Sequence, residues 1–279
     1  MKLYSFILFL LCILLTGCEK DTELPSGPAR PRMNVQDSLV MVAFYHSMKC
    51  AEWKPGFHWD LKDYTTWGGV EAALDEINNE YRIIKITVPN ASTYLPDGYQ
   101  LPKELGNLKY LNTLIVYGDE RAKGGIPPEL FNCPLETLII QGGNSFSGPK
   151  GFTGSIPKEI GKVANTLKHL HIIATNIGGE IPEEVGMLKA LTSSPFLHAN
   201  HFTGKVPLCF RYLSYNSNLS RNYFTEMDWR YFTEDVGYVP VLEQNCLSGE
   251  VPLDVLNSDR WKRYGHNLQN QRNGYQLNY

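Results

Sequence analysis

The side chains that could carry chemistry begin with a set of glutamates that recurs along the chain. Each follows a proline at an equivalent place in a repeated Pro-containing phrase. Glycoside hydrolysis needs two carboxylates on either side of one bond, so carboxylates at one equivalent position in successive repeats predict a solvated stripe instead of an acid/base pair. These residues are Glu104, Glu129, Glu159, Glu183 and Glu184.

Histidines form the second set. His169 and His171 alternate in a predicted strand, so they share one face and could hold a metal with a third ligand. The repeat frame predicts that His198 points to the opposite side, which favours solvated histidines and no metal or cofactor. The sequence also contains no phosphate loop, nucleophile elbow or zinc-binding helix motif. It therefore predicts a protein that is not an enzyme.

The first residues predict an export signal. MKLYSFILFLLCILLTGC has one Lys, an apolar run and small residues before Cys18. The Leu-Thr-Gly-Cys ending resembles the bacterial lipobox, which implies that residues 1–17 are removed and Cys18 is lipidated. Residues 18–32 are rich in proline and charge and predict an extended tether. Acidic residues after the acylated Cys resemble the export signal of outer-surface lipoproteins. They imply the outer membrane of a Gram-negative bacterium, with the protein exposed at the surface.

The rest of the composition narrows the partners. Basic and acidic residues are nearly balanced, at 26 and 29, so the charge does not predict a nucleic-acid partner, which favours clustered Lys and Arg. Beyond Cys18 and the signal, no CxxC spacing suggests zinc or redox chemistry. Secretion permits disulfides, but spacing alone does not pair the remaining thiols, and buried free cysteines are expected. The thiols in question are Cys50, Cys133, Cys209 and Cys246.

The elements that position these side chains come from an internal repeat. The phrase NHFTGKVP, ending at Pro207, returns as NCLSGEVP, ending at Pro252. Earlier Gly-x-Ile-Pro copies end at Pro127, Pro157 and Pro182, and the 45-residue gap before Pro252 contains a worn copy around Asn222. Trp229 stands where proline begins the segment after that copy, which predicts a core-filling role. Solenoids stack such units because one unit cannot bury its apolar face alone.

Each unit predicts a short strand followed by a turn. In Leu-x-x-Leu-x-Leu, alternate side chains point inward, and a polar residue then satisfies the buried turn. Inward pairs are predicted at Leu114/Val116, Leu138/Ile140 and Leu170/Ile172. The polar slot is predicted at Asp119, Asn144, Thr175, Asn200, Asn222 and Asn245, with Asn144 and Asn200 ambiguous by one residue.

PKEIGKVANTLKHLHI and PEEVGMLKALT resemble the plant-type leucine-rich repeat, which also occurs in bacterial surface lipoproteins. The resemblance implies an α/β repeat solenoid over residues 82–256. Its expected form is a horseshoe with a concave parallel β-sheet, an irregular or 3-10 convex side and a helical N-terminal cap.

Residues 33–81 resemble the cap of that class. Asn34 with Asp37 predicts the start of a helix that carries Leu39, Val42 and Phe44 inward. Trp53, Trp59 and Trp67 are expected to cover the first coil. Ala72 stands where the family has a Cys, which puts a cap disulfide of Cys50 in doubt. Residues 257–279 predict a C-terminal cap, with a ligand-stacking patch of Trp261, Tyr264 and Tyr275 as the alternative.

Side chains that point outward from the predicted strands are the candidate binding residues. They form three rows across the sheet, and the resemblance implies recognition of a protein or peptide by this face. The alternatives are capture of a glycan, which would need exposed aromatic platforms, and a purely structural envelope component. The rows are Thr113, Thr137 and His169; Ile115, Ile139 and His171; and Tyr117, Gln141 and Ile173.

Overall fold

The computed structural model describes residues 31–53, 59–88, 95–143, 150–234 and 237–278. The predicted signal peptide, Cys18, most of the tether and Asn144 lie outside the described residues. Residues Arg32–Tyr279 form one compact unit.

The main sheet of this unit is largely parallel. Its strand order is β1-β3-β4-β5-β6, with β2 paired antiparallel to β3. The strands are β1 (Arg32–Met33), β2 (Val70–Asp75), β3 (Glu80–Val88), β4 (Thr113–Tyr117), β5 (Thr137–Gln141) and β6 (His169–Ile173). Beyond β6 the sheet continues as parallel bridges that join His171 to Phe196, Phe196 to Asn218, and Asn218 to Val241.

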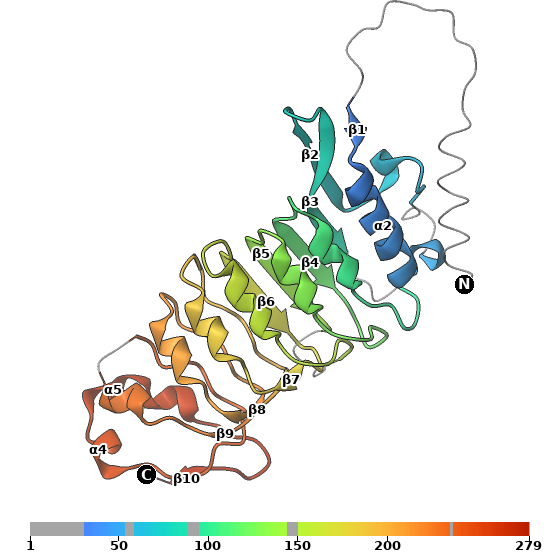
Figure 1. Ribbon diagram of the computed structural model, residues 1–279. Coiled ribbons are helices and arrows are strands. Elements are labelled where there is room, and N and C mark those ends of the chain that lie inside the picture. The colour runs from blue at the N-terminus through green and yellow to red at the C-terminus, as the bar shows by residue number, and fades with distance from the viewer. Residues whose placement is uncertain (1–30, 54–58, 89–94, 144–149, 235–236, 279) are drawn as a thin grey trace, which may run out of the picture. The chain divides into compact units, whose positions relative to one another are not determined.

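Short 3-10 segments return the chain after each strand and stack beside one another (Figure 1). Each begins directly after a proline, which takes the N-cap position with an extended ψ between 130° and 144° and lacks an N–H that would need a partner. They are η3 (Lys103–Asn107), η4 (Pro128–Asn132), η5 (Lys158–Val163), η6 (Glu183–Met187) and η7 (Leu208–Tyr212). Trp229 occupies the proline position before α3 (Arg230–Thr233) and packs half-buried against the core, as predicted.

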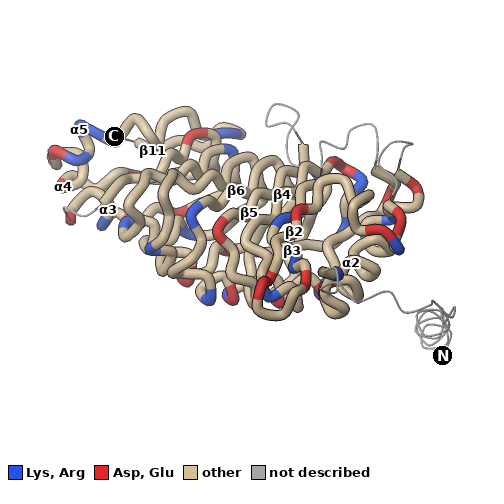
Figure 2. Tube along the Cα trace, turned by 90° about the horizontal axis from the view of Figure 1, so that it is seen from above, with Lys and Arg blue, Asp and Glu red and all other residues tan. Residues whose placement is uncertain are grey.

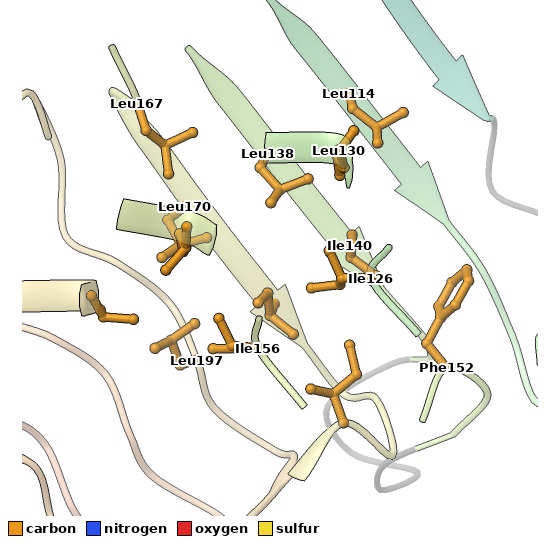
Figure 3. Close-up of a cluster of buried hydrophobic side chains, with 14 of the residues drawn as sticks. Leu114, Ile126, Leu130, Leu138, Ile140, Phe152, Ile156, Leu167, Leu170 and Leu197 are labelled. Carbon is orange, nitrogen blue, oxygen red and sulfur yellow. The ribbon is translucent and has the colours of Figure 1, made fainter. Parts of the chain in front are cut away.

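The core lies between the strands and the return segments. All six predicted inward residues of β4, β5 and β6 are fully buried. Figure 3 shows Leu114, Leu138 and Leu170 pointing into the same interior as Leu130 of η4. Phe152, five residues before Pro157, is also buried and packs edge-on against Tyr99. The turn before Pro157 therefore contributes a large side chain to the core.

A ladder of buried amides closes the turns of successive coils. Asn222 donates from Nδ2 to the main-chain oxygens of Leu197 and Leu219, at 2.9 and 3.0 Å, and accepts from the N–H of Phe202. Asn200 and Asn245 repeat this arrangement, which resolves the frame at Asn200. We call Thr175, Asn200, Asn222, Asn245 and Gln271 the ladder residues.

Gln271 extends the ladder into the segment expected as a C-terminal cap. Its Nε2 donates to the oxygens of Leu242 and Leu268, and its Oε1 accepts from Leu247 N–H. Residues after Pro252 thus form α4 (Leu253–Leu256), α5 (Asp259–Tyr264) and η8 (Gly265–Leu268), then one more coil. Small parallel sheets join β7 (Gly178–Gly179), β8 (His201–Lys205) and β9 (Tyr223–Glu226), and β10 (Gly249–Glu250) with β11 (Leu277–Asn278).

The N-terminal cap combines the predicted helix with a hairpin that was not predicted. Asn34 caps α2 (Val35–Ser47) by accepting from Asp37 N–H, and Phe44 is buried as expected. The prediction for Leu39 was wrong, since its side chain is 46% exposed, and Val42 is only half-buried. The buried face instead presents Val40 and Met41 beside Asp37, whose carboxylate pairs with Arg82.

The tryptophans of the cap are buried, as predicted. Trp59 stacks with Phe44 and Trp67, and its ring meets Trp53 edge-on. The 3-10 turn η1 (Cys50–Glu52) precedes Trp53, and η2 (Tyr64–Thr66) lies between Trp59 and Trp67. The four described cysteines are free and buried, which confirms the expectation of buried free thiols.

Charged residues of both signs alternate along the coils (Figure 2). Within the described part of the chain, no helix combines the length and apolar character needed to cross a bilayer.

Candidate functional site

The predicted rows are formed by the register of three strands. Thr113, Thr137 and His169 are Cα partners, as are Ile115, Ile139 and His171, and Tyr117, Gln141 and Ile173. Neighbouring strands lie about 4.8 Å apart, so side chains within a row contact one another. All nine are half-buried while their strand neighbours point into the core. The sheet therefore presents these nine side chains on its open face.

The open face extends by two side chains that the sequence frame missed. Leu197 is fully buried, so Phe196 and His198 on either side of it point outward. The prediction that His198 lies on the wrong side was therefore incorrect. The signal was present in the sequence, because Leu197-x-x-Asn200 matches Leu219-x-x-Asn222, but the one-residue ambiguity at Asn200 obscured it.

The middle row becomes an apolar ridge, defined here as Ile115, Ile139, His171 and Phe196. Phe196 bridges to His171 in the sheet, and their ring centroids are 4.8 Å apart. The His198 ring also meets the Phe196 ring edge-on, with ring centroids 6.0 Å apart. Aromatic contacts of this kind hold the rings in place and leave a preformed surface.

Two histidines of this face, His171 and His198, favour the neutral form. Burial lowers the pKa of His171, with further lowering from His169 and His198, and burial together with Arg221 lowers the pKa of His198. His169 Nδ1 lies 2.9 Å from Ser193 Oγ. Among the described residues, no group of three His, Cys, Asp or Glu side chains is arranged to hold a metal ion. His171 and His198 thus present uncharged, polar aromatic rings on this face near pH 7.

The glutamate stripe lies on the return segments, away from these rows. Glu104, Glu129 and Glu159 line an open groove of about 920 Å³ beside the Gly-x-Ile-Pro turns. Coils approach closely here: a Cβ on Gly106 would lie 2.2 Å from the main-chain oxygen of Glu129. The stripe therefore follows from the stacking of equivalent coils, with one glutamate on each of η3, η4 and η5 and two on η6.

Comparison with solved structures identifies the architecture. One similar structure is the crystal structure of PEPR1-AtPEP1, with a TM-score of 0.59 and 20% identity over 80% of this chain and 30% of that chain. The fold is a leucine-rich repeat solenoid. The chain spans less than a third of the length of that relative, so the similarity concerns the fold alone.

Other solved structures align less closely. The ectodomain of the receptor kinase GASSHO1/SCHENGEN3 from Arabidopsis thaliana has a TM-score of 0.42 and 27% identity over 56% of this chain and 18% of that chain. A plant ice-binding protein has a TM-score of 0.44 and 21% identity over 89% of this chain and 88% of that chain. No family model and no curated protein matches the sequence.

Proposed function

We propose that this leucine-rich repeat unit is a non-enzymatic recognition module that binds a protein or peptide segment on the open face of its sheet. The observation that carries the proposal is the apolar ridge, four touching side chains from four successive coils. A polar row of Thr113, Thr137 and His169 flanks it on one side, and a mixed row of Tyr117, Gln141 and Ile173 flanks it on the other. Apolar centres with polar edges are the usual composition of protein interfaces.

Burial supports a partner of this kind. The ridge residues are held by their neighbours, so binding would order few additional side chains, and preorganised surfaces lose less entropy on association. Ile115 and Ile139 offer apolar area, whereas His171 and Phe196 offer aromatic faces. A bound segment could therefore place aliphatic and aromatic side chains along one line of the sheet.

Glycan capture is the alternative, and the aromatic side chains do not favour it. Sugar binding would use coplanar, exposed rings. The stacked ring pairs among the described residues, Phe44 with Trp59 and Trp59 with Trp67, are buried in the cap. Trp261 and Tyr264 pack partly buried against the core, and Tyr117 is half-buried.

Selection from a displayed random-peptide library tests the proposal, using the chain from Arg32 onward. Selected peptides should bind the unaltered protein and lose at least tenfold in affinity, measured by calorimetry, for Ile139→Asp. Met187→Asp is the matched control, because Met187 is 51% exposed on a return segment. Peptides that bind Ile139→Asp equally well would contradict the proposal. Glycan-array binding that is lost only in Ile139→Asp would favour the alternative, and no ligand in either assay would favour a structural role.

We propose further that lipidation of Cys18 anchors the protein in the outer membrane of a Gram-negative bacterium, with the repeats exposed at the surface. The support is the sequence MKLYSFILFLLCILLTGC and the charged segment after it. Cys18→Ala should move the protein from the membrane fraction to the soluble fraction, and protease added to intact cells should degrade the wild-type repeats. Membrane association that persists in Cys18→Ala would contradict the anchor.

A further inference from the structure

A second row of side chains lies where each coil leaves its ladder residue. His201 follows Asn200, Tyr223 follows Asn222, and Arg272 follows Gln271. The His201 and Tyr223 ring centroids are 5.2 Å apart, and the Arg272 guanidinium carbon lies 4.5 Å from the Tyr223 ring centroid. We call these three residues the rim cluster.

A short residue lets Arg272 reach across one coil. Cys246 occupies the row position between Tyr223 and Arg272, and only 6% of it is exposed. Arg272 Nε donates to the Gln244 main-chain oxygen at 2.8 Å, which orients the guanidinium along the row. Stacking and this hydrogen bond hold the charged group in one place, so little side-chain entropy remains to be lost on binding.

The polar ends of the rim cluster have no partner among the described residues. No carboxylate pairs with Arg272, and neither the Tyr223 hydroxyl nor a His201 ring nitrogen makes a hydrogen bond to the described part of the chain. Burial and the nearby Arg272 both lower the pKa of His201. The Arg272 guanidinium is thus a positive charge without a carboxylate partner among the described residues. Its neighbours in the row are the Tyr223 hydroxyl and the His201 imidazole.

We propose that the rim cluster binds a carboxylate side chain of an acidic peptide. The free Nη groups of Arg272 match a carboxylate in a planar, bidentate pair, and the Tyr223 hydroxyl adds a third donor. A sugar ring is disfavoured because the guanidinium already covers one face of Tyr223. A nucleic acid is disfavoured because its phosphates are held by several cations, whereas the rim cluster has one.

This inference does not depend on the proposed peptide binding by the apolar ridge. Hexaglutamate is the probe, titrated into the full-length chain in mild detergent at low salt. The readout is the NMR signal of the Arg272 Nε–H, assigned by its disappearance in Arg272→Lys. We expect this signal to shift on titration with hexaglutamate. We also expect the protein to bind hexaglutamine with at least tenfold lower affinity than hexaglutamate.

Variants distinguish binding at the rim cluster from non-specific attraction of hexaglutamate to other positive charges. Arg272→Gln should reduce hexaglutamate affinity at least tenfold by calorimetry, and Tyr223→Phe should reduce it severalfold while it keeps the stacked ring. Arg263→Gln is the matched control, because the Arg263 guanidinium also lies over a tyrosine ring, that of Tyr264 at 5.9 Å. The hexaglutamate affinity of this variant should differ from wild type by less than twofold. Ile139→Asp should leave this binding unchanged whatever its effect on ridge ligands.

Three results would overturn the assignment. They are wild-type affinity in Arg272→Gln, an equal loss in Arg263→Gln, and tighter binding of polygalacturonate than of hexaglutamate. If Arg272→Gln fails to fold, as judged by its thermal melt, Arg272→Lys and Tyr223→Phe carry the test, and wild-type affinity in both overturns the proposal.

Discussion

The side-chain Oδ1 of Asn200 accepts two hydrogen bonds from Thr175, one coil earlier: from the main-chain N–H at 2.9 Å and from the hydroxyl at 2.7 Å. Thr175 in turn uses its hydroxyl to accept from Ile177 N–H. A threonine therefore suffices where the ladder begins, whereas later positions need an amide that both donates and accepts. The ladder has a direction, because each amide completes the coil before it.

Removing one ladder amide should destabilise the solenoid strongly. Asn222→Ala would leave Phe202 N–H and the Leu197 oxygen buried without their partner. Each such orphan costs about 1–3 kcal/mol, so we expect the free energy of unfolding to fall by roughly 3 kcal/mol. Urea unfolding of the chain from Arg32 onward measures it. Asn107→Ala, at an exposed position of η3, should change it by less than about 0.5 kcal/mol.

The pair that joins the cap helix to the first long strand is a second sensitive point. Asp37 is fully buried and accepts from Arg82 Nε, Arg82 Nη2 and Ile83 N–H. Arg82→Met should lower the free energy of unfolding by about 3–5 kcal/mol, because it leaves a buried carboxylate without its cation. The double variant Asp37→Leu/Arg82→Met should recover part of this loss in the same urea measurement. A single variant no worse than the double would contradict this account.

Asp228 predicts a loss of stability in acid. It accepts from Arg230 Nε and Nη2 and lies 2.9 Å from Lys205 Nζ, and these partners hold its pKa well below the usual range. A depressed folded-state pKa contributes stability that is complete above the unfolded pKa, near 3.8, and is lost as pH falls through the folded value.

The unfolding free energies of wild type and Asp228→Asn should therefore differ most at pH 7 and converge as pH falls below about 4. Asp254→Asn, at an exposed position, should show little difference from wild type at pH 7. A gap between wild type and Asp228→Asn that stays constant from pH 7 to pH 2.5 would show that the ionised carboxylate is not what stabilises this region.

Thiol reactivity should be low in the folded protein. Burial raises the pKa of both Cys133 and Cys209 to about 12, so at pH 8 only about one thiol in ten thousand is the reactive thiolate. In the chain from Arg32 onward, Ellman's reagent should react slowly under native conditions and rapidly in urea. Met187→Cys would add one exposed thiol that reacts at an ordinary rate. Rapid native labelling of Cys133 or Cys209 would mean that these coils open readily.

The repeat phrase predicted the solenoid, the inward strand positions and the row register, because a period of two fixes which side chains share a face. The polar slot at Thr175 was also confirmed. That the nine row residues bind a ligand stays a prediction. The face predicted from the sequence was incomplete. Whether Phe196 and His198 point outward depends on how the repeat is aligned at Asn200, which the sequence left ambiguous by one residue.

Other features had no readable signal. The residue before each ladder position has a positive φ, between 55° and 59°, at Ala174, Ala199, Arg221, Gln244 and Asn270. Glycine and asparagine are the usual residues in this left-handed region, so Ala, Arg and Gln do not indicate it. Gln271 was missed for a related reason: glutamine is one methylene longer than the asparagine of the pattern, and only the position of the last coil shows that it reaches the same acceptors.

The direction of the ladder has a consequence for how the chain acquires its shape. Ribosomes deliver the N-terminal coils first, and each newly emerged amide satisfies buried groups of the coil already made. Synthesis of the chain and hydrogen bonding of its buried turns thus proceed in the same direction, from the N-terminus to the C-terminus. A nascent protein arrested at any coil from Asn200 onward exposes one unfinished turn at its newest end, while the older turns of the ladder are already hydrogen-bonded.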